Sequence, residues 1–389
     1  MFDGCTNITS ISFGSGVQNI PSYLCYGLSK LTSITIPDSV ISIGNYAFEN
    51  CNRLDSVIWN ARNAEDFNTS PFYSSSGRVK VLILGDSVQH IPANLCNGLN
   101  RIKEITIPDK VETIGPSVFV GCDSLTRVDI TNLSTWCGTD FTATSTPLRT
   151  AELYVNGAKP QRIDVPNGLT KVGSFSLINC SQLTEVLLPP SVTEIGESAF
   201  AGGSRLQTVT LDANLTTIGD SAFNNCPYLI TVNANMEFPP LISSSVFANC
   251  GDLSYVDCNV PQNSLGLYRK TAVWSSFSLH GTPTFTVSFV DWDNTPIASQ
   301  TVLQGTDATA PDNPTRDGYT FTGWSASFTN VQSDLTIIAQ YEQDTPSDYE
   351  LIEEGDSLST SVRKVFENGQ LYIVLPDGIR YDVTGRRIK

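Results

Sequence analysis

The chain has 389 residues, a length typical of two or three domains, and 40% of them are hydrophobic, which is enough to build a folded core. Its 39 acidic residues outnumber the 23 Lys and Arg residues, so the formal net charge is −16. This balance argues against nucleic acid as a partner and against a basic membrane anchor, because both interactions need cations to meet phosphates.

A repeated motif runs through the first two thirds of the chain. The segment Leu31–Cys51 reads LTSITIPDSVISIGNYAFENC, and Ile102–Cys122 matches it position by position. The motif ends at residues 5, 28, 51, 99, 122, 180, 203, 226 and 250, in steps of 23 or 24 residues with two longer gaps. The extra residues of these gaps fit the stretches 60–78 and 131–150, which we interpret as loop insertions in degenerate repeats.

Each repeat predicts one coil of a solenoid. Ile34 and Ile36 alternate with Thr35, so a short strand turns its two apolar side chains to one side. One coil cannot bury that side alone, whereas stacked coils share a continuous interior. Pro37 follows the strand and ends its pairing. We expect Gly44, which follows the second apolar position, to serve a turn with unusual dihedral angles.

The full motif, with its A-F-x-x-C ending, resembles the BspA-like leucine-rich repeats of bacterial surface proteins over about residues 1–258. The resemblance implies a mainly β, right-handed solenoid of about 11 coils at the cell surface, with a binding role. Residues 259–277 leave the motif and predict a cap helix with Tyr268 and Trp274 on one face, which completes a solenoid domain over 1–281. Met1 stands where Ala47 stands in its own repeat, so we expect the natural chain to begin earlier.

Further segments follow the solenoid. Residues 282–342 carry the motif Gly318-Tyr-Thr-Phe-Thr-Gly-Trp324 and resemble the Listeria–Bacteroides repeat, or internalin B-repeat, which implies a small β-grasp-like spacer module. Residues 343–360 predict an acidic linker. Residues 361–389 predict a β-hairpin tail, which resembles the C-terminal sorting modules of Bacteroidetes secreted proteins. A plain β-meander that packs on the previous module explains this tail equally well.

Most of the ten cysteines occupy fixed positions of the repeat. Six stand at its last position and two replace Phe48, which predicts small interior side chains. Leu28 stands at the same last position, and a required disulfide would not permit such a replacement. We therefore expect buried free thiols, with a Cys226–Cys250 disulfide as the alternative, because these residues lie on consecutive coils. The chain has no C-x-x-C pair, so we expect no metal site.

The outward strand positions form the candidate binding surface. Residues at one position of successive strands form ladders on a sheet face. A polar docking surface for a protein or glycan is one interpretation of these ladders, and an ordinary solvated sheet face is the other. In the central repeats we predict as ligand-binding residues Glu104, Arg127, Asp129, Glu152, Tyr154, Arg162, Asp164 and Glu185.

No set of acid, base and nucleophile converges in this sequence, and only His90 and His280 offer an imidazole. We therefore expect no catalytic residues, no cofactor and no enzymatic activity. The sequence predicts a monomeric, secreted or cell-surface adhesion protein, without a membrane span, that engages a host or cell-surface protein or a glycan. A passive surface stalk is the alternative, and an enzyme-associated module is a third and weaker one.

Overall fold

The computed structural model describes Cys5 and residues 7–73, 77–344, 363–367, 370–375, 378–382 and 386–388. The chain divides into two compact units. The first unit, which holds the whole repeat region, comprises Met1–Phe289, Pro296–Asp312 and Ser327–Ile337. The second unit comprises Val290–Thr295, Asn313–Ala326 and Ile338–Lys389.

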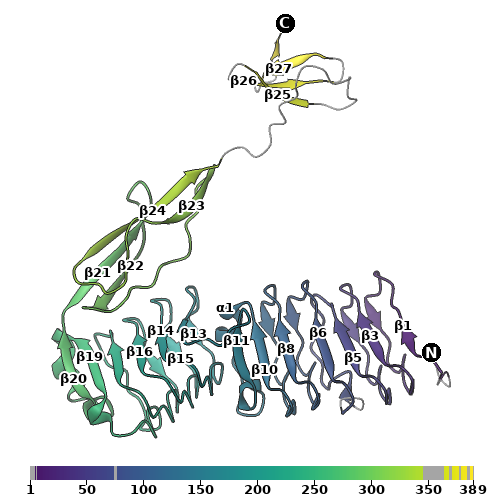
Figure 1. Cartoon of the computed structure of the whole chain (residues 1–389), viewed down its shortest axis with the longest axis horizontal. Coiled ribbons are helices and arrows are strands. Elements are labelled where there is room, and N and C mark those ends of the chain that lie inside the picture. The colour runs from purple at the N-terminus through teal and green to yellow at the C-terminus, as the bar shows by residue number, and fades with distance from the viewer. Residues whose placement is uncertain are drawn as a thin grey trace. The chain divides into compact units, whose positions relative to one another are not determined.

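The repeat region is a β-solenoid of about 12 turns, whose main strands stack in parallel from coil to coil (Figure 1). These strands form three sheets. The first contains, in spatial order, β1 (Ser10–Ile11), β3 (Ser33–Ile36), β5 (Ser56–Trp59) and β6 (Val81–Leu84). The second contains β11 (Glu152–Val155), β10 (Arg127–Ile130) and β8 (Glu104–Ile107). The third contains β12 (Arg162–Asp164), β14 (Glu185–Leu187), β16 (Thr208–Leu211), β18 (Thr231–Ala234), β19 (Asp257–Pro261) and β20 (Ser278–Thr282).

A second set of strands, each two residues long, lies further along the coils. They pair as β2 (Asn19–Ile20) with β4 (Ser42–Ile43), β7 (His90–Ile91) with β9 (Thr113–Ile114), and β15 (Glu194–Ile195) with both β13 (Lys171–Val172) and β17 (Thr217–Ile218). The predicted mainly β solenoid is therefore confirmed, with two short strands in most coils.

The interpretation of 131–150 as a loop insertion needs correction. Helix α1 (Leu133–Gly138) lies within it and carries the buried Trp136 and Cys137. The amide of Gly173 donates to the carbonyl of Cys137 (2.7 Å), as the amide of Gly196 does to Val172 in the next coil (2.8 Å). The helix therefore takes the place of a two-residue strand in a coil.

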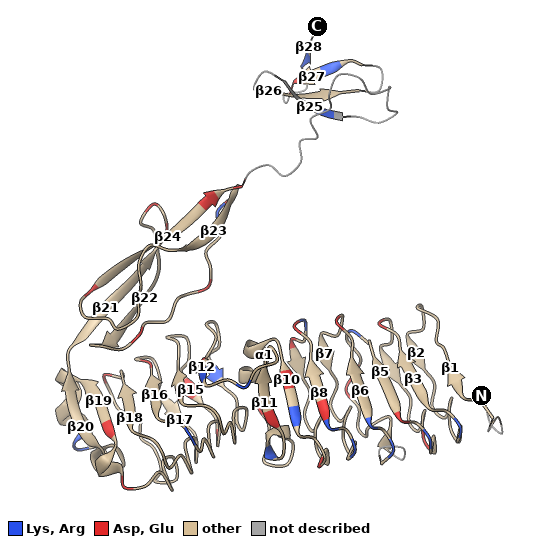
Figure 2. Ribbon diagram, in the orientation of Figure 1, with Lys and Arg blue, Asp and Glu red and all other residues tan. Residues whose placement is uncertain are grey.

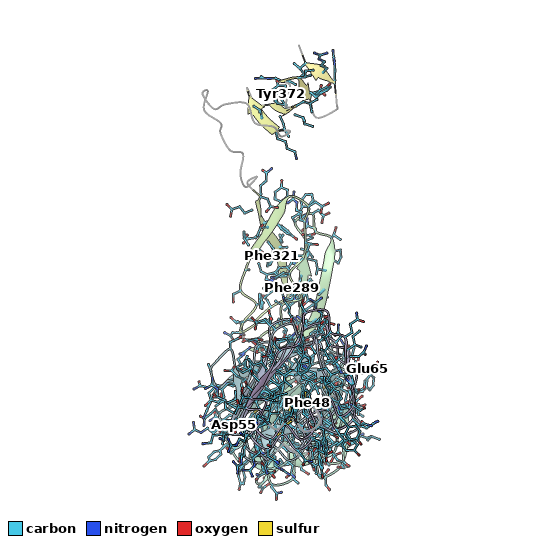
Figure 3. All side chains as sticks on the ribbon, turned by 90° about the vertical axis from the view of Figure 1, so that its right-hand side faces the viewer. Phe48, Asp55, Glu65, Phe289, Phe321 and Tyr372 are labelled. Atoms are coloured by element: carbon cyan, nitrogen blue, oxygen red, sulfur yellow. The ribbon has the colours of Figure 1, made fainter. Side chains whose placement is uncertain are left out.

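The interior of the solenoid is a continuous column of apolar side chains. Phe48 is fully buried and stacks on Phe72 of the next coil, with ring centres 5.4 Å apart. Viewed along the coils, Phe48 lies inside, with Asp55 and Glu65 on opposite sides (Figure 3). The predicted repeat register is confirmed, because the position of Phe48 returns to the interior in successive coils.

The role predicted for Gly44 was wrong. Its φ is outside the left-handed region, and its amide donates to the carbonyl of Ile20 in the previous coil (2.7 Å). A Cβ at Gly44 would overlap the backbone of Ser22. Gly219 is equally close to Glu197. The glycine is therefore required for close approach of neighbouring coils.

The cysteines are all unbonded, and every one except Cys5 is buried, which confirms free thiols over a Cys226–Cys250 disulfide. The Cys51 thiol donates to the carbonyl of Cys25 in the previous coil (3.2 Å), and Cys250 donates to the carbonyl of Phe223 (3.0 Å). Burial raises the pKa of Cys25 to about 12 and that of Cys51 to about 11. These thiols stay protonated at neutral pH and link adjacent coils as weak donors.

The predicted cap helix is much shorter than expected. It consists of α2 (Leu265–Tyr268), flanked by 3-10 turns at Gln262–Ser264 and Trp274–Ser276, and β20 extends the sheet beyond it. Val273 adopts φ 69°, which interrupts any helix through it. Tyr268 and Trp274 are nevertheless fully buried, and their polar atoms donate to the carbonyls of Met236 (3.0 Å) and Pro240 (2.8 Å).

Two four-stranded sheets follow the solenoid in the chain. The first has the order β22 (Pro296–Leu303), β21 (Thr284–Val290), β24 (Leu335–Gln343) and β23 (Tyr319–Trp324). The second has the order β25 (Arg363–Glu367), β26 (Gln370–Val374), β27 (Arg380–Asp382) and β28 (Arg387–Ile388). Most of the predicted acidic linker lies outside the described residues.

Candidate binding surface

The predicted site residues fall into two groups, because β11 ends one sheet and β12 begins another. An antiparallel bridge between Val155 and Ala158 turns the chain between them. The expectation that all these positions lie one repeat apart on one ladder was therefore wrong. The first group contains Glu104, Arg127, Asp129, Glu152 and Tyr154, and the second contains Arg162, Asp164 and Glu185.

The first group forms a compact cluster on β8, β10 and β11. Arg127 pairs in register with Glu104 on one side and Glu152 on the other. Its guanidinium donates to Asp129 (2.6 Å) and lies 3.9 Å from the ring centre of Tyr154. We call this group, together with Lys159, the charged cluster.

Lys159 is a member of the charged cluster that sequence reasoning missed. It forms an ion pair with Glu152, and its ammonium lies 5.5 Å from the ring centre of Tyr154. It follows the Val155–Ala158 bridge, which returns the chain to the strand face. The repeat pattern gives no signal for this return, because the coil here is shorter than a full repeat.

The electrostatics of the charged cluster keep its cations charged. The hydrogen bond to Asp129 raises the pKa of Arg127, and the hydrogen bond to Glu152 raises that of Lys159. Both cations lie near the ring of Tyr154, an arrangement that is favourable because the face of an aromatic ring is electronegative. The cluster therefore presents a fixed pattern of opposite charges around one aromatic ring.

The second group forms its own ion-pair network. Arg162 donates to Asp164 on the same strand (2.7 Å) and to Glu185 on β14 (3.1 Å). Arg162 also donates to Asp307 (3.4 Å), so three carboxylates share one guanidinium. This group lacks an aromatic side chain and satisfies its charges locally, so it offers less to a ligand than the charged cluster.

A hollow of about 720 Å³ lies where the first two sheets of the solenoid meet. Its apolar part is formed by Val81 and Ile83 on β6, which are 46% and 50% exposed. Lys80, Arg101, Lys103 and Glu104 contribute its charged part. We call this feature the strand-face hollow. Sequence reasoning missed it, although the wholly apolar run of β6 was a signal, since only alternate residues of such a strand face the interior.

Charge divides the strand face into two regions (Figure 2). The strands β3, β5 and β6 carry no charged residue, whereas β8, β10 and β11 do. The strand-face hollow lies at the boundary, because Glu104 belongs to both the hollow and the charged cluster. The two features together form a continuous surface of apolar and charged parts.

Within the described residues, no group of three or more His, Cys, Asp or Glu side chains is arranged to hold a metal ion. His90 lies on β7, where its ring nitrogens contact Thr113 (2.7 Å) and Asp66 (3.0 Å). His280 contacts Asp257 on the neighbouring strand (3.0 Å). Each imidazole is thus engaged in a contact between coils.

No helix among the described residues is long and apolar enough to cross a membrane.

The fold and this surface define a leucine-rich repeat solenoid with a polar strand face. Residues 1–126 and 149–268 match the BspA type leucine rich repeat region in six copies, so the chain belongs to that family. Residues 285–345 match the Listeria–Bacteroides repeat domain. The stretch between the two matched parts of the solenoid holds α1. No curated protein matches the sequence.

Several solved structures are similar to the chain. A leucine rich cell surface protein from Faecalibacterium prausnitzii is 21% identical, with a TM-score of 0.31, and the match covers 65% of this chain and 86% of the other. A leucine-rich repeat protein from Bacteroides ovatus is 22% identical, with a TM-score of 0.25 and coverages of 68% and 88%. The pneumococcal vaccine antigen PcpA is 16% identical, with a TM-score of 0.32 and coverages of 70% and 86%.

Proposed function

We propose that this protein is a non-catalytic binding protein of the bacterial surface that holds a protein partner on the strand face from β6 to β11. The observation that carries the proposal is the strand-face hollow, in which exposed aliphatic side chains lie directly beside the charged cluster. Protein interfaces combine an apolar centre with a polar rim in this way. The charges give specificity, since each must meet its complement on the partner.

A location at the cell surface or outside the cell is part of the same proposal. The BspA-type family and the Listeria–Bacteroides repeat domain support it. For the tail β25–β28, a sorting module and a plain β-meander both remain open predictions.

The experiment uses the full chain against a panel of immobilised extracellular matrix proteins, with binding measured by surface plasmon resonance. Ile83→Asp places a charge in the apolar part of the strand-face hollow. Thr35→Asp is the matched control, because Thr35 occupies the same ladder position as Ile58 and Ile83 two strands away. We expect Ile83→Asp to weaken binding at least about tenfold and Thr35→Asp to leave it unchanged.

Two outcomes would contradict the proposal. Equal weakening by both variants would show that the strand-face hollow is not the contact. Absence of binding to every matrix protein would favour the alternative of a passive stalk, in which the solenoid only spaces other parts from the envelope.

A further inference from the structure

The N-terminal coils carry a group of exposed tyrosines, three on the turns that follow β2 and β4 and one, Tyr73, in the coil after them. Tyr23, Tyr26, Tyr46 and Tyr73 are all exposed, which is unusual for side chains of this size. The ring centre of Tyr23 lies 5.7 Å from that of Tyr26 and 5.2 Å from that of Tyr46. We call these four residues the tyrosine cluster.

Coil stacking arranges the tyrosine cluster in two columns. The amide of Tyr23 donates to the carbonyl of Asn45, next to Tyr46, so these two tyrosines lie in neighbouring coils at the same position (3.2 Å). Tyr26, Glu49 and Tyr73 each follow the interior position of their coil, the position of Phe48. The second column therefore places a carboxylate between two phenol rings.

The backbone gives no reason for tyrosine at the first column. Tyr23 and Tyr46 have φ of 61° and 60°, in the left-handed region that bulky side chains disfavour. Other coils use Ser198 and Ser221 at the same position, with φ of 52° and 59°, and one uses Phe175, with φ of 57°, which packs against the core. The rings of Tyr23 and Tyr46 contact each other, with centres 5.2 Å apart, and remain 46% and 53% exposed, so packing uses only part of their surface. A ligand that stacks on the exposed part of these rings would offset the backbone cost.

A hollow of about 670 Å³ lies beside the columns. Tyr46 and Tyr73 contribute aromatic surface to it, and Glu49 and Asp66 contribute carboxylates. The Asp66 side chain is fixed by the amide of Ala93 (2.6 Å), and this hydrogen bond lowers its pKa. The volume suits a small ligand, and the lining combines aromatic rings with many polar groups.

We propose that the tyrosine cluster and its hollow bind a neutral saccharide chain. A pyranose ring has a face of C–H bonds that stacks on a phenol ring, and its hydroxyl groups donate to carboxylates such as Glu49 and Asp66. Neither Lys nor Arg is among the described residues that line the hollow, and Asp66 contacts His90 (3.0 Å). The carboxylates of Glu49 and Asp66 therefore disfavour uronic, sialic or sulfated sugars, because like charges repel. This site is separate from the strand face of the proposed function and does not depend on it.

The experiment measures binding of cellohexaose and chitohexaose to the full chain by saturation-transfer NMR and calorimetry, with hexagalacturonate as the anionic comparison. The test variant is Tyr46→Ser with Tyr73→Asn, which introduces residues that other coils carry at these positions, as in Ser198 and Asn224. The control is Tyr228→Asn, because Tyr228 is 64% exposed and Tyr73 is 65% exposed. Thermal unfolding of all variants checks their folding.

We expect at least one neutral hexasaccharide to bind, the test variant to weaken it about tenfold or more, and Tyr228→Asn to leave it unchanged. Ile83→Asp should also leave it unchanged, which separates this site from the strand-face hollow. The proposal is overturned if neither neutral saccharide binds at about 10 mM. It is equally overturned if hexagalacturonate binds as tightly, or if the control weakens binding as much as the test variant.

Discussion

Phe48 shows how one residue ties neighbouring coils together. Its ring is fully buried and stacks on Phe72, so Phe48→Ala leaves a cavity in the shared interior. We expect this variant to lower the free energy of unfolding by about 3–5 kcal/mol, measured by denaturant titration. Phe238→Ala is the control, because Phe238 is exposed, and it should have little effect. Equal effects of both changes would refute the repeat register.

Asp212 makes stability depend on pH. It is almost fully buried after β16, and burial raises its pKa to about 6. Because the folded pKa lies above the unfolded one, the protonated carboxyl stabilises the fold at low pH, and this stability is lost as pH rises through about 6.

Asp212→Asn removes this titration. We compare the free energy of unfolding of the variant with that of the wild-type chain. We expect the difference in favour of the variant to be roughly 2 kcal/mol larger at about pH 7.5 than at about pH 4.5, because only the ionised carboxyl is costly to bury. Denaturant unfolding at the two pH values measures the difference. If the difference in free energy of unfolding between variant and wild type is the same at both pH values, Asp212 is ionised in the folded chain without cost.

The cysteines give a third residue-scale prediction. Since all ten are unbonded, thiol titration in denaturant without reductant should find nearly all ten free. In native conditions most of the buried ones should react slowly, because burial raises their pKa and thiolate is the reactive form. Cys250 differs, since its hydrogen bond with Cys226 lowers its pKa. Four or more bridged cysteines in the purified chain would contradict this account.

At the scale of elements, the glycine that follows each short strand sets the distance between coils. Gly44→Ala adds a methyl group where the backbone of Ser22 already lies, whereas Gly14→Ala adds one to open space. We expect Gly44→Ala to lower the thermal midpoint by several degrees and Gly14→Ala to change it little, as scanning calorimetry would show. If the two variants melt alike, close approach of coils is not the reason for the glycine.

The sequence predicted the elements whose cause is local, and missed those whose cause lies between coils. Alternation at Ile34 and Ile36 was enough to place a strand and its buried side. The role of Gly44 depends on Ser22 in another coil, so spacing alone suggested a turn instead. The prediction of a long cap helix failed for a local reason. The positive φ of Val273 is unusual for a β-branched residue, and the sequence carries no signal for it.

The candidate site was predicted only in part, for a reason that belongs to the whole molecule. Residue type located the charged cluster, because Arg127 and Tyr154 stand out among outward positions. Two features arise where one sheet ends and the next begins: the strand-face hollow, and the division of the site residues between β11 and β12. The repeat period does not reveal where the sheets end. The repeat period assumes that every coil is equivalent, whereas the candidate binding features lie at coils that differ from the others.

At the scale of the whole molecule, we propose that the strand face from β6 to β11 is the contact for a protein partner. Hydrogen–deuterium exchange of the full chain, alone and saturated with a matrix protein that it binds, tests this claim most directly. The account predicts slower exchange in peptides that contain β6, β8 and β10, and unchanged exchange in those that contain β16 and β18. Protection confined to residues 285–345, with none on the solenoid strands, would contradict it.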